Sequence, residues 1–477
     1  MRITILDPTC GSGAFLFAAL NILELLYEAC IQRMRSFVDE NGKGKHKFFE
    51  ETLAQVNAPE HPNLQYFIYK SIILNNLYGV DIMNEAVEIA KLRMFLKLVA
   101  TVDADYRKPN LGLEPLPDVD FNIRAGNTLV GYATEDALKN SLATDLIANL
   151  ELPRIEEQCD IVARAFARYK EIQLQGHADF EDFKTAKDEL NDRLDKLRNE
   201  LNQLLHKQHY ANMKYDQWLL MHQPFHWFAE FYEIVQGKGG FDVVIGNPPY
   251  VVYTKRDSKT KISVADKYKL VDYSTLPANN LYSFVIERSS IILENIGKLG
   301  MIIPIASIST DGMKELQKLY YRVFNGEWHS NFATRPGKLF EGVDMNLTIS
   351  ILSKGKTECN FVTSYIRWYD GAGKNRPFIF SLLSYYDKPH FENQSNSYPK
   401  ISSRAEIDIL YKMFQHKKMF NSFYSYSGNS IYYHSGGRYW RKAITESFSS
   451  HYKKITLQED NSSVALCLLN PSSWFEK

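Results

Sequence analysis

The order of apolar and polar residues predicts alternating strands and helices in the first part of the chain. A short apolar run at residues 3–6 is followed by the loop residues DPTCGSG and by a long apolar helix that begins at AFLF. A polar, Gly-containing insertion runs from Val38 to Pro62. A second strand, loop and helix follow as NNLYGVDI and NEAVEIAKLRMFLKL, where Asn84 can cap the helix. FNIRAG predicts a third strand, which ends near Asn127.

The segment from Leu150 to Tyr215 has a different pattern. Leucines recur there at alternating steps of four and three, with charged residues between them, at Leu190, Leu194, Leu197, Leu201 and Leu204. This heptad spacing predicts an amphipathic helix that packs in a helical hairpin. A coiled coil that binds a partner is the alternative.

The strand and helix pattern resumes at Phe241. FDVVIGN predicts a buried strand, NPPY a loop, NLYSFVIERSSIILEN a helix, and GKLGMIIPIASI a Gly turn with another buried strand. Leu347, Ile349 and Ile351 alternate with polar residues, which predicts a half-exposed strand near an edge of the sheet. Strands that alternate with helices indicate an α/β fold with a doubly wound, mostly parallel sheet.

The composition changes again after about Ser381, where Tyr, Ser and Asn dominate and Gly-rich turns occur. We therefore place a domain boundary between Lys356 and Lys388. A length of 477 residues agrees with two or three domains.

Charge and cysteine content narrow the class of protein. The 56 Lys and Arg residues balance the 56 Asp and Glu residues, so net charge gives no sign that the protein binds nucleic acid. A DNA enzyme can nevertheless gather positive charge on one face. The five cysteines are dispersed without a CxxC pair, so we expect no disulfide framework, no metal site and a reducing cytoplasm. The start MRITILDPT differs from a signal peptide, and no apolar run reaches the ~18–20 residues of a membrane span, so we expect no membrane partner.

The loop DPTCGSGAF has the features of an anion-binding turn. Gly11 and Gly13 lie between a strand and a helix, where glycine lets a ligand approach the backbone closely. The free N–H groups at the helix start attract an anion such as a carboxylate, and Asp7 at the strand end could hold an ammonium. A ligand with both groups is an amino-acid moiety. A purely structural turn is the alternative.

In GVDI, Asp81 stands at the carboxyl end of a strand, directly before a helix. An acidic residue in this place can bind the two hydroxyls of a ribose. A helix-capping or surface aspartate is the alternative.

The loop GNPPY carries the most specific chemistry. Its two prolines fix the backbone and remove two N–H donors, while their carbonyls remain as acceptors. The Asn247 amide oxygen and the Pro248 carbonyl can accept the two hydrogens of an exocyclic purine amine. These hydrogen bonds push the nitrogen lone pair out of conjugation with the ring. The amine can then attack the methyl group of a sulfonium. Tyr250 would stack on the base, which must be flipped out of a duplex. A Pro-rich turn is the alternative.

In this order, these loops resemble those of the gamma-class N6-adenine DNA methyltransferases, especially of Type IIG restriction-modification enzymes. The resemblance runs from Ile3 to about Lys354 and more weakly beyond. It implies a Rossmann-like class I methyltransferase fold and the cofactor S-adenosyl-L-methionine. RAGNTL resembles the motif that meets the cofactor's adenine, although an aspartate is common there. The implied cofactor-binding residues are Asp7, Cys10, Gly11, Gly13, Asp81, Ile82 and Asn127, and the implied catalytic tetrapeptide is Asn247, Pro248, Pro249 and Tyr250.

Two further motifs imply DNA contacts. KLFEGVDMNLTISIL resembles the later hairpin of the family, where Phe340 would be the second aromatic that sandwiches the flipped base; an ordinary core phenylalanine is the alternative. The aromatic C-terminal part lies where the family has its target-recognition region. Its candidate contacts to phosphates or guanine edges are Arg438, Tyr439, Trp440, Arg441 and Lys442, for which a surface hairpin is the alternative.

The resemblance divides the chain into four segments. Residues 1–147 form the cofactor-binding half of the methyltransferase domain, 148–236 a helical insertion, 237–380 the catalytic half, and 381–477 an α+β target-recognition region that looks cut short. Family members usually carry an upstream cofactor motif, and often a nuclease with an acidic-Lys signature, neither of which this sequence contains. We therefore expect a fragment or one piece of a split protein, with an N-terminal partner chain or restriction subunit.

The predicted function is transfer of a methyl group from S-adenosyl-L-methionine to N6 of a flipped-out adenine in double-stranded DNA, within a restriction-modification or phage-defence system. One alternative is an inactive fragment or DNA-recognition subunit of a split system. Another is a protein glutamine methyltransferase, which also uses NPPY but is generally much smaller, or an RNA methyltransferase. Binding of the cofactor by this chain alone separates the enzyme from the inactive subunit.

Overall fold

The computed structural model describes residues 3–42, 44–58, 61–102, 106–107, 116–143, 152–175, 180–356, 358–369, 374–388, 398–415, 420–434, 443–458 and 461–469. Backbone contacts divide the chain into two compact units. The first consists of Met1–Lys388 and Glu392–Ser402, and the second of Pro389–Phe391 and Ser403–Lys477. The first three predicted segments fall within the first unit.

A nine-stranded sheet organises the first unit, with strand order β3-β2-β1-β4-β5-β7-β6-β8-β9. The strands are β1 (Ile5–Asp7), β2 (Leu77–Asp81), β3 (Ile123–Ala125), β4 (Phe241–Gly246), β5 (Leu293–Pro304), β6 (Gly326–Phe332), β7 (Leu347–Ser353), β8 (Cys359–Ile366) and β9 (Tyr385–Asp387). Strands β1 to β5 are parallel, and β7 is antiparallel to both β5 and β6. The predicted α/β fold with a mostly parallel, doubly wound sheet is confirmed.

The strand order reverses at β1. The chain runs outward from β1 through β2 to β3, and then returns to place β4 on the other side of β1. Ile5 and Leu6 of β1 therefore pair with Leu77 and Tyr78 on one side, and with β4 on the other. A reversal of this kind opens a crevice at the carboxyl ends of the strands, which is where ligands bind in open α/β sheets.

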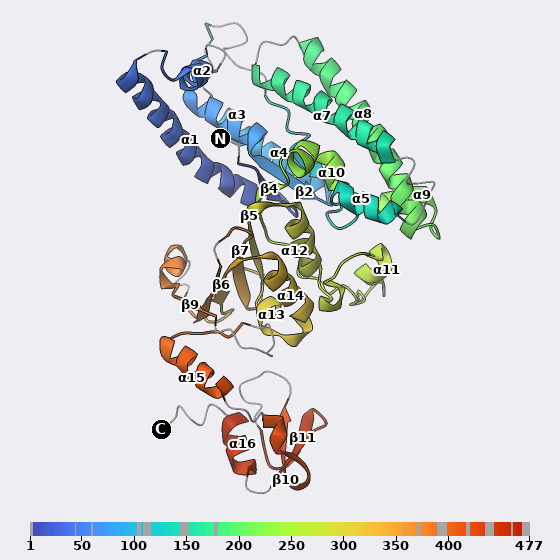
Figure 1. Cartoon of the computed structure of the whole chain (residues 1–477), viewed down its shortest axis with the longest axis vertical. Helices are drawn as coiled ribbons and strands as arrows, with labels where there is room; N and C mark the ends of the chain where they lie inside the picture. Colours follow the sequence, from blue (N-terminus) through green and yellow to red (C-terminus); the bar gives the residue numbers. More distant parts are fainter. Residues whose placement is uncertain are drawn as a thin grey trace. The chain divides into compact units, whose positions relative to one another are not determined.

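Helices cover both faces of the sheet, as Figure 1 shows. In the first part of the unit they are α1 (Ala14–Asn41), α2 (Lys47–Val56), α3 (Leu64–Asn75), α4 (Asn84–Val99), α5 (Glu135–Leu142), α7 (Leu152–Gln175), α8 (Phe180–His209), α9 (Tyr215–His222), α10 (Trp227–Glu230) and the π-helix η2 (Glu233–Gly237). After β4 come α11 (Val264–Tyr268), η3 (Leu276–Ala278), α12 (Leu281–Ile292), α13 (Ala306–Ser309), η4 (Asp311–Met313), α14 (Lys314–Val323) and η5 (Arg376–Leu382).

Neighbouring residues of β2 show which helices lie on which face. Successive side chains of a strand point to opposite faces. A Cβ atom at Gly79 would lie 2.8 Å from Leu16 of α1. The ring of Tyr78, one residue earlier, packs edge-on against Phe231, with centroids 5.6 Å apart. Helix α1 thus covers one face, and the segment around α10 covers the other.

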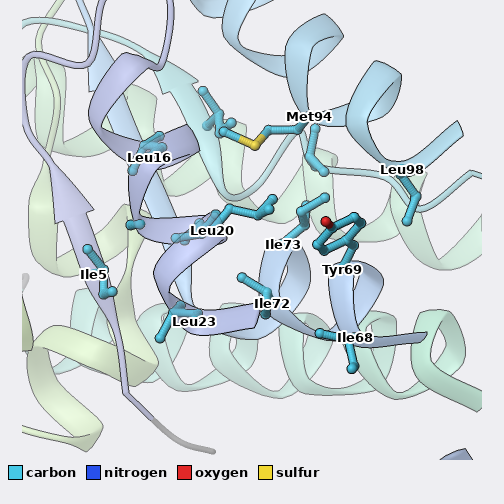
Figure 2. Close-up of a cluster of buried hydrophobic side chains, with 14 of the residues drawn as sticks. Ile5, Leu16, Leu20, Leu23, Ile68, Tyr69, Ile72, Ile73, Met94 and Leu98 are labelled. Carbon is cyan, nitrogen blue, oxygen red and sulfur yellow. The ribbon is translucent and has the colours of Figure 1, made fainter. Parts of the chain in front are cut away.

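Figure 2 shows the apolar core beneath α1. Leu16, Leu20 and Leu23 recur at helical spacing on the inner side of α1 and are at most 2% exposed. They pack in one cluster with side chains of α3 and α4, including Ile72 and Met94. Each buried aliphatic side chain of this size contributes roughly 1.5–3 kcal/mol. This core fixes the start of α1 against the sheet and, with it, the loop that follows β1.

Helix α1 corrects one expectation from the sequence. Its residues Ala14–Glu40 are long and apolar enough to cross a membrane by length and composition. The sequence pattern predicts one long apolar helix here, but no apolar run of the ~18–20 residues that a membrane span needs. Core helices of soluble proteins pass the same test, and the inner side of α1 is packed in the core.

The leucine heptad forms part of the core between α7 and α8. Four of its leucines, Leu190, Leu194, Leu197 and Leu201, are at most 3% exposed, and Figure 1 shows α7 and α8 side by side. The predicted amphipathic helix of a helical hairpin is confirmed, because these leucines are already covered within the chain.

Buried ion pairs tie this insertion to the sheet. Arg124 of β3 lies 2.7 Å from Glu230 of α10, which also pairs at 2.7 Å with Arg198 of α8. Burial lowers the pKa of Arg124 to about 10. Burial alone would raise the pKa of Glu230, but the two arginines hold it at about 2. Glu230 therefore stays ionised, and the helical insertion is anchored to β3.

Strand β7 corrects the prediction of a strand near a sheet edge. It lies between β5 and β6 and is bonded to both. Leu347, Ile349 and Ile351 share one face, on which exposure rises to 42% at Ile351, whereas Thr348, Ser350 and Leu352 on the opposite face are 0% exposed. The alternation of apolar and polar residues along a strand does not show whether the strand has a hydrogen-bonded neighbour on one side or on both.

The second unit is α+β, as predicted. It contains α15 (Arg404–Gln415), η6 (Phe420–Phe423), the antiparallel pair β10 (Tyr424–His434) and β11 (Tyr452–Leu457), and α16 (Ser462–Leu469). Ile431, Ile455, Leu457 and Ala465 form its core. The predicted DNA-contacting residues Arg438, Tyr439, Trp440, Arg441 and Lys442 lie outside the described residues.

Candidate active site

A pocket of about 430 Å³ lies at the carboxyl ends of the central strands. Loops that follow β1, β2, β3 and β4 meet there, although they are far apart in the sequence. The residues that line it are Pro8, Thr9, Asp81, Ile82, Asn127, Thr128, Leu129, Asn247, Pro249, Val251, Val264, Tyr268, Leu270, Leu281 and Val285. The pocket therefore brings together the loops that the sequence singled out.

The loop after β1 needs its glycines for backbone geometry. Gly11 and Gly13 have positive φ values of 50° and 76°, which side chains rarely adopt. A Cβ atom at Gly13 would also lie 3.0 Å from Ala90 of α4, so this glycine allows α1 and α4 to approach closely. No side chain caps the start of α1, which leaves the N–H groups of its first turn to bind a ligand.

Asp7 is the buried acid of this loop. It is 1% exposed and accepts a hydrogen bond of 3.1 Å from the Thr9 N–H. Burial raises the pKa of Asp7 to about 7, against the lowering effect of that hydrogen bond. The negative charge of Asp81 raises it further. A carboxylate held in this state gains by receiving a cationic partner.

Cys10 occupies the inner side of the same loop. It is 5% exposed, and its N–H donates to the Val80 carbonyl at 2.9 Å. Burial raises the pKa of the Cys10 thiol. Its side chain thus packs as an apolar group between the loop and β2, and it is not among the residues that line the pocket.

Asp81 connects the first loop to the end of β2. Its Oδ2 accepts the Gly11 N–H at 2.8 Å, and its Oδ1 accepts the Met83 N–H at 2.9 Å. Each carboxylate oxygen can accept a second hydrogen bond from a ligand hydroxyl. Asp81 therefore serves local structure at the start of α4 and also presents acceptors to the pocket.

The loop after β3 is held on two sides. Asn127 is 6% exposed, and its side-chain oxygen accepts the Leu129 N–H at 3.0 Å. Thr128 donates its hydroxyl to the carbonyl of Pro8, and its own carbonyl accepts the Trp227 indole N–H at 3.2 Å. The oxygen of the Asn127 amide is thus engaged locally, and its NH₂ group is the part that can bind a ligand.

The tetrapeptide after β4 presents two of its residues at the pocket. Asn247 and Pro249 line it, while Pro248 is buried and is not among the lining residues. The Tyr250 hydroxyl lies 2.5 Å from Asn247 Oδ1 and 2.9 Å from the Ile302 carbonyl, and can donate to either. Burial raises the pKa of Tyr250, so this hydroxyl keeps its proton. The oxygen expected to accept a target amine is here within reach of Tyr250.

The segment after the tetrapeptide closes one side of the pocket. Val251, Val264, Tyr268 and Leu270 all line it, together with two side chains of α12. The sequence interpretation missed these residues. The sequence feature that could have identified them is a set of apolar positions among charged ones, directly after NPPY.

Two buried charges of α12 hold this segment in place. Glu287 is 6% exposed and accepts four hydrogen bonds of 2.6–2.9 Å, from the N–H and hydroxyl groups of Ser274 and Thr275. Arg288 donates to the Tyr273 hydroxyl at 2.8 Å, and that hydroxyl donates to the Leu129 carbonyl at 2.8 Å. The pair therefore links the segment after the tetrapeptide to the loop after β3. The sequence signal that was missed is a pair of adjacent charges in an otherwise uncharged helix.

Phe340 is the one predicted base-stacking residue that lies in neither the tetrapeptide nor the loops after β1, β2 and β3. It is half-buried in the connection between β6 and β7 and is not among the residues that line the pocket. Its role in stacking on a base therefore stays a prediction. Among the residues that the structure describes, no group of three or more His, Cys, Asp or Glu side chains could hold a metal ion.

Comparison with known families gives two matches. The family described as "Eco57I restriction-modification methylase" matches residues 75–332, slightly more than half of the chain. The family described as "MmeI, DNA-methyltransferase domain" matches residues 1–132.

Two curated proteins are similar to the chain. A putative type II restriction enzyme and methyltransferase of Methanocaldococcus jannaschii, RM.MjaORFECS2P, is 28% identical over 344 residues, which is 64% of this chain and 26% of that protein. The type II restriction enzyme and methyltransferase RM.Eco57I of Escherichia coli is 38% identical over 78 residues, which is 16% of this chain and 8% of that protein. The matched parts thus amount to about a quarter or less of these relatives.

Solved structures show distant similarity. A nuclease-deletion mutant of the Type ISP restriction-modification enzyme LlaGI, in complex with a DNA substrate mimic, has a TM-score of 0.41 and 13% identity over 90% of this chain and 26% of that one. The DrdV–DNA complex has a TM-score of 0.38 and 12% identity over 81% and 27%. The EcoKI M protein has a TM-score of 0.33 and 10% identity over 84% and 52%.

Proposed function

Because the chain belongs to the family of the Eco57I restriction-modification methylases, we propose that it is a site-specific DNA methyltransferase that acts on N6 of a flipped-out adenine. The proposed cofactor is S-adenosyl-L-methionine, and the proposed setting is a restriction-modification or phage-defence system in the cytoplasm. Double-stranded DNA is the proposed substrate, and a restriction subunit or an N-terminal chain is a second proposed partner. The observation that carries the proposal is the single pocket in which the loops after β1, β2, β3 and β4 meet.

The groups around the pocket fit this cofactor. Asp7 offers a buried carboxylate for the ammonium, and the uncapped start of α1 offers N–H groups for the carboxylate of the methionine part. Asp81 offers acceptors for the ribose hydroxyls, and the Asn127 amide offers a donor for a ring nitrogen of the adenine. When bound, the cofactor supplies the electrophilic methyl group of its sulfonium.

Asn247 and Pro248 are the proposed activating pair. The side-chain oxygen of Asn247 and the carbonyl of Pro248 accept the two hydrogens of N6, which frees the nitrogen lone pair for attack. Tyr250 then gives up its hydrogen bond to Asn247 and keeps the Ile302 carbonyl as acceptor. One hydrogen bond replaces another, so this exchange costs little. The Tyr250 ring stacks on the base that is held there.

Labelled methyl transfer tests the proposal. The purified chain, S-adenosyl-L-methionine with a labelled methyl group and mixed genomic DNA should yield N6-methyladenine on nucleoside analysis. Asn247→Ala should abolish transfer while cofactor affinity, measured by calorimetry, stays close to wild type. Asn21→Ala, an exposed position on α1, is the matched control and should behave as wild type. Cofactor binding without transfer to any DNA would instead identify a recognition subunit. Label in RNA or in a protein glutamine would replace the proposed substrate.

A further inference from the structure

The polypeptide directly after the catalytic tetrapeptide carries a concentration of positive charge. We use the name basic flap for residues 254–269, which include α11. Its basic residues are Lys255, Arg256, Lys259, Lys261, Lys267 and Lys269, and its acidic residues are Asp257 and Asp266. All six basic side chains are exposed. The whole chain has 56 basic and 56 acidic residues, so this local excess is not a general property of its surface.

The two acids of the flap are engaged by its own turns. Asp257 accepts the N–H groups of Lys259 and Thr260 at 2.9 and 2.8 Å. Asp266 accepts the N–H and the hydroxyl of Ser263 at 2.9 and 2.8 Å, which forms a capping box at the start of α11. Each carboxylate is thus bound by backbone donors, and little of it is left to pair with the lysines.

The basic side chains have few intramolecular partners. Among the described residues, Arg256 is the one member of the six with a carboxylate within 4.0 Å, that of Asp266 at 3.9 Å. An ion pair at this distance between exposed groups contributes little. Folding of the flap therefore does not depend on these charges, and they are available to a partner.

The inner side of the flap is apolar and fixed. Val264 and Tyr268 line the pocket, and the Tyr253 hydroxyl accepts the N–H of Leu270 at 2.7 Å. The Glu287 carboxylate holds the turn that follows, at Ser274 and Thr275. Figure 1 shows α11 on a loop that stands away from the sheet beside α12. The flap therefore presents a fixed basic surface next to the pocket that holds Asn247.

A solvated surface that aids solubility is the simplest alternative. It does not explain why the positive charge is concentrated beside the pocket, on a segment whose acids are already used. A polyanion that must place one of its groups in this pocket does explain it. Duplex DNA carries one negative charge per ~1.7 Å of its axis, and lysine or arginine side chains bind it through its phosphates.

We propose that the basic flap is a phosphate-contacting surface that holds the backbone of duplex DNA beside the flipped-out adenine. This inference rests on the proposed function, because it takes duplex DNA as the substrate. Contacts of this kind position the DNA independently of its sequence. The flap thus contributes to affinity for any duplex, while the choice of target site resides elsewhere.

The test is the salt dependence of DNA binding. The full chain with Lys255→Gln, Lys259→Gln and Lys261→Gln should bind a non-specific duplex at least about tenfold more weakly than wild type. Its slope of log affinity against log salt should fall by about 1 for each phosphate that the flap no longer neutralises. The matched control replaces three exposed lysines elsewhere, Lys47→Gln, Lys184→Gln and Lys196→Gln, and should leave both quantities unchanged.

The outcomes separate the flap from the enzyme activity. Equal affinities and slopes for the flap variant and wild type would overturn the inference, even if wild type forms N6-methyladenine. A wild type that binds DNA through the flap but transfers no methyl group would overturn the proposed function alone. No binding of duplex DNA by wild type would overturn both. Calorimetry should give the flap variant an unchanged affinity for the cofactor, and thermal unfolding should show that it is folded.

Discussion

The backbone of Gly246 lies directly against the carboxylate of Asp7, since a Cβ atom at Gly246 would be 2.8 Å from Asp7 Oδ1. The residue before the proposed catalytic tetrapeptide and the buried acid of the first loop are therefore in contact. The proposed cofactor site and the proposed catalytic loop share this contact, so we expect a change in one to affect the other.

Replacement of Gly246 by alanine should damage both functions together. The added methyl group forces the Asp7 carboxylate or the tetrapeptide to move, at a cost of about 1–3 kcal/mol. We expect a lower affinity for the cofactor and a lower kcat in methyl transfer assays. Gly312→Ala is the control, because no atom lies within 4 Å of its added Cβ. A Gly246→Ala protein with wild-type kinetics would show that the contact is unimportant.

The affinity for S-adenosyl-L-methionine should depend on pH through Asp7. Burial raises its pKa to about 7, so the carboxylate that would hold the ammonium forms mainly above that pH. Affinity measured by calorimetry should therefore rise between about pH 6 and about pH 7.5. Asp7→Asn should bind more weakly and lose this dependence. A wild type and an Asp7→Asn variant with parallel pH profiles would assign the titration to another group.

The same shift predicts how the stability of the unliganded protein changes with pH. Folded Asp7 binds a proton that the unfolded chain releases near pH 3.8, because its folded pKa is raised to about 7. The stability that protonated Asp7 contributes is therefore fully present below pH 3.8, the unfolded pKa, and is lost as the pH rises through the folded pKa of about 7. Denaturant unfolding of wild type and Asp7→Asn should show a difference in stability that changes over this interval. An identical pH dependence in both proteins would contradict the shift.

Glu287→Gln should raise the KM for the cofactor more than it lowers kcat. The amide replaces one acceptor oxygen with a donor that faces the N–H and hydroxyl groups of Ser274 and Thr275. Leaving such buried groups unpaired costs about 1–3 kcal/mol, and the segment that closes the pocket should loosen. Glu181→Gln, on the exposed side of α8, is the control. If Glu287→Gln lowers only the amount of folded protein, and the folded fraction has a normal KM, then Glu287 contributes to stability alone.

The two parts of the Tyr250 side chain should have separable effects. Tyr250→Phe removes the hydrogen bond to Asn247 but keeps the ring, so kcat should stay within a few-fold of wild type. Tyr250→Ala also removes the ring, and loss of stacking on one base, about 1–3 kcal/mol, should lower kcat/KM roughly tenfold to a hundredfold. Single-turnover methyl transfer by both variants measures the difference. Equal losses in the two variants would show that the hydroxyl is the essential part.

The loops of the site could be predicted because each is a local motif. Asp7, Asp81 and Asn247 each follow a recognisable buried strand, and the carboxyl ends of parallel strands share one edge of the sheet. The meeting of Asp81 and Asn247 in one pocket, with Asp7 buried beside Gly246, follows from those two facts. Asn127, two residues beyond the third strand, was identified instead through the resemblance of RAGNTL to a family motif.

The rest of the site depends on long-range contacts that local patterns do not contain. Val264 and Leu270 line the pocket, and Glu287 on a later helix holds the turn that lies between them and that helix. A pattern of exposed charges with occasional apolar residues looks like an ordinary loop until that helix is placed. The position of β7 inside the sheet was missed for a similar reason, since the number of neighbouring strands is decided by the fold and not by the strand itself.

The pairing of β1 with β4 also determines when the pocket can first form. Thr4, beside β1, is bonded to Asp242 of β4, a residue 238 positions further along the chain. During synthesis at about 5–20 residues per second, more than about ten seconds pass between the appearance of these two strands. Until then one edge of β1 has no partner, and the crevice has only one wall. The helices beneath α1 can pack early, but the pocket is completed only after the ribosome has translated the whole helical insertion.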